Sequence, residues 1–113
     1  MISKMRTFKN RRRFKFRLLA PLVLALWSAG APQAADMIKG GDLYAAHCVA
    51  CHGASGVSVM PGTPSFARNE GLLQPDLTLL AAIKAGKNVM PAFQGVLSDR
   101  DILDVIAYLR TLN

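Results

Sequence analysis

The stretch Cys48-Val49-Ala50-Cys51-His52 decides how the rest of this chain can be interpreted. Two thiols three residues apart on one helical turn can reach the two vinyl groups on one side of a porphyrin and form thioethers. The histidine that follows then lies over the iron, where neutral imidazole binds if its other N–H finds an acceptor. C-x-x-C-H is the spacing of c-type haem attachment. We therefore expect one covalent haem c at Cys48 and Cys51, with His52 as an axial ligand of the iron.

Three other uses of the motif fit the sequence less well. A thioredoxin-like C-x-x-C needs a βαβ context, and no segment alternates apolar and polar residues as a strand does. A structural zinc site needs four protein ligands, whereas the chain contains one further histidine, His47, and no further cysteine. A disulfide between Cys48 and Cys51 would close a very short loop and leave His52 without a role.

The iron needs a second axial donor from a distant part of the chain. Met90 lies 38 residues beyond His52, and Pro91 stiffens the turn that would present it. A thioether is a soft ligand that favours ferrous iron, and a Met/His pair raises the reduction potential. Met60 is the alternative, but it lies only eight residues after His52. We predict Met90 as the sixth ligand and Met60 as apolar cover for the haem edge.

Helices and long loops are expected on both sides of the motif. A first helix is predicted over 38–48. A second opens at residue 75 or 76 and ends before Gly86, which occupies the position of a C-terminal cap. The segments 53–66 and 87–97 are rich in glycine, serine and proline or carry turn residues, and predict loops.

The last helix is the most clearly marked element. Ser98 is its expected N-cap, and Asp101 is the capping-box partner three residues later. An apolar stripe at helical spacing follows, formed by Ile102, Val105, Ile106, Leu109 and Leu112. The sequence therefore predicts an all-α domain of three to four helices, with long loops wrapped around the haem.

The basic charge of the chain belongs to its N-terminal segment. The formal net charge is +7, but eight of the 14 basic residues lie among the first 17 residues. A basic segment, an apolar run over 18–31 and small residues after it have the layout of a secretory signal. We predict a signal peptide over 1–34, cleaved near Ala34 or Ala35. The remaining domain, 35–113, has six basic and seven acidic residues, which gives a net charge of −1.

These features also limit the classes of function. Fourteen apolar residues with Pro21 among them are too few to cross about 30 Å of hydrocarbon, so an uncleaved anchor is the less favoured alternative. Arg11-Arg12-Arg13-Phe14 resembles a twin-arginine signal. That route carries folded proteins, whereas this domain is expected to fold only after receiving haem outside, so we favour general secretion to the periplasm. Sparse, mixed charges on the domain argue against nucleic-acid binding.

Residues 36–113 resemble the small class I c-type cytochromes. Besides the CVACH motif, Gly40 with Tyr44 four residues later is similar to the pattern of their first helix. VIAYL at 105–109 is similar to their last helix, where Tyr108 would pack against the first. The MPAF segment beginning at Met90 is similar to the loop that carries the sixth ligand.

The resemblance implies a small cytochrome c fold and one further site residue. Members of the family have a proline whose carbonyl accepts the N–H of the axial histidine. In the segment TPSF this role falls to Pro64, with Pro61 as the second choice.

The function implied is transfer of single electrons between redox protein donors and acceptors. An iron with both axial sites filled has no open position for a substrate, so we expect a monomeric periplasmic carrier and not an enzyme. Two alternatives remain. One is a haem sensor or enzyme with a labile sixth ligand; the other is a small haem subunit or maturation partner of a larger respiratory enzyme.

Overall fold

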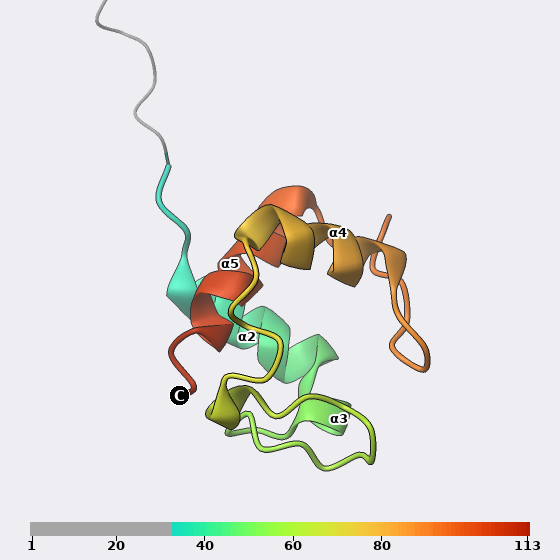
Figure 1. The fold of residues 1–113 in the computed structure, drawn as a ribbon. Coiled ribbons are helices and arrows are strands. Elements are labelled where there is room, and N and C mark those ends of the chain that lie inside the picture. The colour runs from blue at the N-terminus through green and yellow to red at the C-terminus, as the bar shows by residue number, and fades with distance from the viewer. Residues whose placement is uncertain (1–32) are drawn as a thin grey trace, which may run out of the picture. The chain divides into compact units, whose positions relative to one another are not determined.

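A computed structural model describes residues 33–113; residues 1–32, with most of the predicted signal peptide, lie outside this part. The elements are α2 (Met37–His47), α3 (Val49–His52), the 3-10 helix η1 (Phe66–Arg68), α4 (Asp76–Ala85) and α5 (Asp99–Leu109) (Figure 1). The described residues contain no strand, only isolated bridges. The predicted all-α fold is confirmed, and the three predicted helices form. None of the described helices is long and apolar enough to span a membrane.

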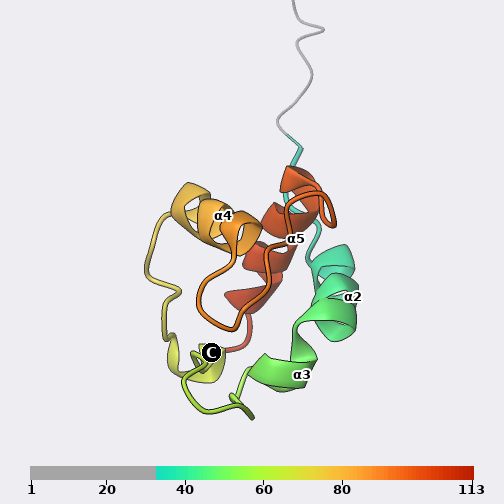
Figure 2. The same ribbon diagram turned by 90° about the vertical axis from the view of Figure 1, so that its right-hand side faces the viewer.

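Helices α2 and α5 cross in close contact, and Gly40 makes this approach possible (Figures 1 and 2). A Cβ atom at position 40 would lie 2.0 Å from the backbone oxygen of Asp104, so only glycine fits there. Beside the crossing, the rings of Tyr44 and Tyr108 have centroids 5.4 Å apart. The glycine and the aromatic residue four positions later therefore form the surface on which α5 packs.

Asp104 has a different role from the one its position in the sequence suggests. Together with Asp99 and Asp101, it places negative charge in the N-terminal half of α5, where the helix dipole favours it. Such residues usually face solvent, yet Asp104 is only 1% exposed. Its carboxylate accepts a 2.8 Å hydrogen bond from the backbone N–H of Asp36, the N-cap of α2. The guanidinium of Arg100 lies 3.2 Å away. A buried carboxylate needs such partners, and through them Asp104 fastens the start of α2 to α5.

The N-terminus of α5 carries the predicted capping box. The Ser98 side chain accepts from the backbone N–H of Asp101 at 3.1 Å, and the Ser98 N–H donates to the Asp101 carboxylate at 3.0 Å. The ammonium of Lys39, 2.5 Å from that carboxylate, and the hydrogen bonds from Ser98 lower the pKa of Asp101 to about 2. The capping carboxylate therefore stays ionised at neutral pH.

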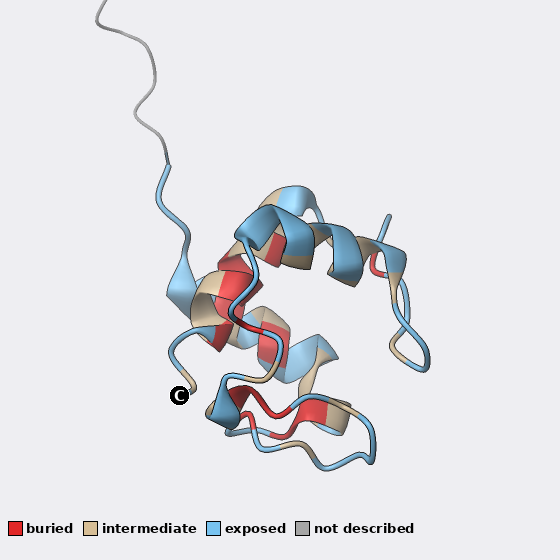
Figure 3. Ribbon diagram, viewed as in Figure 1, coloured by how far each residue is buried: buried red, intermediate tan, exposed pale blue. Residues whose placement is uncertain are grey.

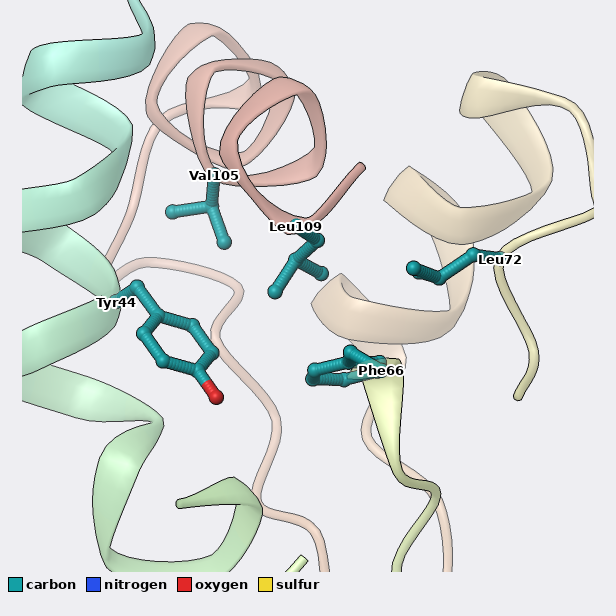
Figure 4. Close-up of a cluster of buried hydrophobic side chains, with 5 residues drawn as sticks. All are labelled: Tyr44, Phe66, Leu72, Val105 and Leu109. Atoms are coloured by element: carbon teal, nitrogen blue, oxygen red, sulfur yellow. The ribbon is translucent and has the colours of Figure 1, made fainter. Parts of the chain in front are cut away.

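The buried apolar core lies where α2, α5 and the segment around η1 meet (Figure 4). Its members are Tyr44, Phe66, Leu72, Val105 and Leu109. Helix α4 packs on α5 but has no buried residue of its own (Figure 3). Since α4 is strongly apolar, its inner side borders a space that this core does not fill.

Candidate functional site

The space beside α4 is a cavity of about 650 Å³, a size usual for cofactor pockets. Its wall is mostly apolar and includes side chains from α4, α5 and both loops, among them Leu72, Leu79, Ile83, Phe93, Ile102 and Val105. Four of the five predicted site residues also line it: Cys48, His52, Pro64 and Met90. The fold therefore brings together residues from three separate segments of the chain.

His52 is held in one orientation by two neighbours. It is 6% exposed, and its Nδ1 lies 3.2 Å from the carbonyl oxygen of Pro64. Because a carbonyl oxygen can only accept, a hydrogen bond here requires the proton on Nδ1. In the neutral ring this tautomer leaves the lone pair of Nε2 free, and that is the form in which imidazole binds a metal. The ring also stacks on Phe66, with centroids 4.4 Å apart. Pro61, the other proline considered, does not line the cavity.

The two cysteines share one helical turn but differ in their relation to the cavity. Both are half-buried and form no disulfide, and the Cys51 N–H donates to the Cys48 carbonyl at 3.2 Å. Cys48 lines the cavity, whereas Cys51 is not part of its wall. Burial, with a smaller effect of Cys51, raises the pKa of Cys48 to about 11, so the group at the cavity is a neutral thiol.

Met90 and Met60 lie in different surroundings. Met90 is half-buried in the loop between α4 and α5 and lines the same cavity as His52. Met60 is 38% exposed and is absent from the wall. Its backbone carbonyl accepts from the Ser58 hydroxyl at 2.9 Å, which holds a turn of the loop. The second histidine, His47, is exposed.

Sequence reasoning missed one hydrogen bond that supports the motif. The buried hydroxyl of Tyr44 donates to the carbonyl of Gly53 at 2.6 Å and so fixes the residue directly after His52. Burial raises the pKa of Tyr44 to about 12, which keeps the phenol protonated as a donor. The sequence shows Tyr44 only as an aromatic residue of a helix crossing, and no spacing rule indicates a bond to a residue nine positions later.

Comparisons with known proteins show the family of this chain. Residues 35–109 match the family described as "Cytochrome C oxidase, cbb3-type, subunit III". The chain is 33% identical to cytochrome c6 of Thermostichus vulcanus over 101 residues, which cover 84% of this chain and 88% of that protein. The chain belongs to the small class I c-type cytochromes.

Further relatives of this cytochrome are consistent with that assignment. It is 37% identical to cytochrome c6 of Gracilaria tenuistipitata var. liui over 78 residues, 67% of this chain and 72% of that protein. Cytochrome c4 of Pseudomonas aeruginosa is 38% identical over 81% of this chain, but the match covers only 46% of that protein. The solved structure of cytochrome c6 from the diatom Phaeodactylum tricornutum superimposes with a TM-score of 0.57 at 32% identity, covering 67% of this chain and 92% of that one. The expected small cytochrome c fold is confirmed.

The residues of this cytochrome fit haem c, the covalent cofactor of its family. The apolar walls suit a porphyrin, Cys48 offers a thiol, His52 offers a ring nitrogen, and Met90 offers a thioether in the same cavity. When bound, haem supplies one-electron oxidation and reduction at its iron. Like its cytochrome c6 relatives, the chain is a small haem c electron-transfer protein. It is an electron carrier and not an enzyme.

Proposed function

We propose that this cytochrome shuttles single electrons between redox proteins in the periplasm, with its haem attached at Cys48 and Cys51 and its iron held by His52 and Met90. The observation that carries the proposal is that His52 and Met90, which come from segments far apart in the chain, line one cavity. With both axial positions filled, the iron changes charge but offers no place for a substrate. Pro64 orients the axial imidazole through its carbonyl.

The proposed location rests on the leader. A signal peptide over 1–34, cleaved near Ala34 or Ala35, would release the domain 35–113 into the periplasm. The first helix of that domain supports this boundary, because its N-cap, Asp36, follows the proposed cleavage site directly and already holds α2 with its side chain.

A second candidate is a haem subunit of a larger respiratory enzyme. The matching family is described as a subunit of a cbb3-type oxidase, and the cytochrome c4 relative extends well beyond the matched part. The coverage of cytochrome c6 favours a free carrier, since the match spans 88% of that relative.

One preparation distinguishes these possibilities. The full chain is expressed in a host that matures c-type cytochromes and is purified from the periplasmic fraction. We expect an intact mass that starts at Ala35 or Asp36 and includes one haem, together with elution as a monomer. The ferrous protein should keep its spectrum on mixing with carbon monoxide, because no axial position is open.

Other outcomes would reject specific parts of the proposal. Rapid carbon monoxide binding by the wild-type protein would favour a sensor or enzyme. Recovery only as part of a detergent-solubilised complex would favour a haem subunit of a larger respiratory enzyme. Recovery only from the membrane fraction, with a mass that still includes residues 1–34, would show that the leader remains as an anchor.

A further inference from the structure

The loop that carries Met90 begins as a tight hairpin at the end of α4. The Lys87 N–H donates to the Met90 carbonyl at 3.1 Å, and the Met90 N–H donates back to the Lys87 carbonyl at 3.0 Å. Asn88, at φ 55°, turns the chain between them. Directly before the hairpin, Gly86 closes α4 at φ 73°, and its N–H donates to the Ala82 carbonyl at 2.9 Å.

The same loop is fastened to α4 a second time, after the methionine. The Phe93 N–H donates to the Ile83 carbonyl at 3.2 Å, and the Gln94 N–H donates to the Lys84 carbonyl at 3.1 Å. Carbonyls in the last turn of a helix lack partners within the helix, so the loop satisfies them. The segment that carries Met90 is thus held by backbone bonds at both ends.

Between these two attachments the loop backbone presses against Gly86. A Cβ atom on Gly86 would lie 2.8 Å from the Met90 oxygen, 2.8 Å from the Ala92 nitrogen and 2.9 Å from the Pro91 carbonyl carbon. All three neighbours are backbone atoms, so no side chain can rotate to make room. Any side chain at position 86 must therefore displace the backbone of Met90, Pro91 and Ala92.

We propose that Gly86 is the positioning residue for the sixth ligand: its lack of a side chain sets the place of the Met90 backbone and so the reach of its sulfur into the cavity. The inference rests on the proposed ligand role of Met90. The loop is fixed at residue 87 and again at residues 93 and 94. A displacement of the backbone at 90–92 therefore cannot spread along the chain and moves the Met90 side chain instead. Ligand sites tolerate errors of only about 0.5 Å.

The chain contains a matched control in the same loop. Gly95 also has a positive φ, 83°, but a Cβ atom there would meet nothing within 4 Å. Alanine at either position adopts a backbone conformation that L-residues disfavour. Only alanine at position 86 also collides with the ligand segment, so Gly95→Ala controls for the strain of a positive φ.

The test compares haem-loaded Gly86→Ala and Gly95→Ala by ferric optical spectrum, reduction potential and carbon monoxide binding. We expect Gly86→Ala to weaken or lose the sulfur-to-iron charge-transfer band, to lower the potential and to bind carbon monoxide about tenfold faster or more, because the open form becomes populated. Gly95→Ala should resemble the wild type. In a Met90→Ala background, Gly86→Ala should change neither potential nor spectrum further.

Several results would overturn the inference. One is a Gly86→Ala protein that keeps the wild-type band and potential while Met90→Ala loses them. Equal effects of the two glycine variants would attribute the change to backbone strain. A Gly86→Ala protein with reduced helical circular dichroism would show that the contact maintains the fold and not the ligand. If Met90→Ala itself changes nothing, the ligand assignment fails first, and this inference fails with it.

Discussion

Replacement of Met90 by alanine should lower the reduction potential and open one axial position of the iron, while the haem stays attached. The thioether that favours ferrous iron is lost, so the potential should fall by on the order of 0.2 V, within the range of about 0.8 V that haem axial ligands cover. The ferric spectrum should lose its weak sulfur-to-iron charge-transfer band. Carbon monoxide and cyanide should then bind readily, which optical titration measures directly.

Met60→Ala is the control for this experiment. Met60 is also followed by a proline, but it is partly exposed and stands outside the wall of the cavity. Its replacement should leave the band and the potential close to wild type. If Met90→Ala alters nothing while the wild-type protein already binds carbon monoxide rapidly, the axial position is open by design, and a sensor or enzyme would be the better account.

Replacement of both Cys48 and Cys51 by alanine should abolish covalent attachment and most of the helical structure. Acid–acetone should then extract any haem that remains, whereas the wild-type protein should retain its haem. A core of fewer than roughly 80 residues seldom supplies more than about 3–5 kcal/mol, and a group that binds only the folded state adds to stability. Here α4 packs on α5 but has no buried residue of its own and borders the cavity, so the burial of its apolar side depends on the haem.

Far-ultraviolet circular dichroism measures the second part of this prediction. The haem-free double variant should show little helical signal and no cooperative thermal transition. A cooperatively folded haem-free domain would contradict it. That result would also return the twin-arginine route to consideration as the export pathway, because that route carries folded proteins.

Local signals in the sequence were sufficient for the three longer helices. The caps at Ser98 and Gly86 depend on residues within one turn of the chain, and the structure has both where the sequence predicts them. The packing of Tyr108 against the first helix was implied by the family resemblance, and the structure places its ring 5.4 Å from that of Tyr44. The caps could be predicted because each is determined by near neighbours in the sequence.

Features that depend on the path of a loop could not be predicted. The sequence left two prolines as partners for His52, and only the folded loop places the Pro64 carbonyl 3.2 Å from the imidazole. The acidic pattern of the last helix gave no sign that Asp104 is buried and accepts from Asp36, 68 residues away in sequence. Such contacts arise from packing between distant segments, which spacing rules do not describe.

A potentiometric titration of the wild-type protein, with optical spectra recorded in both oxidation states, tests the central claim most directly. The account predicts one reversible one-electron step, a ferric spectrum with the sulfur-to-iron charge-transfer band, and a six-coordinate ferrous form. A ferric spectrum without that band, together with a five-coordinate ferrous form, would show an open axial position and would contradict a His52/Met90-ligated electron carrier.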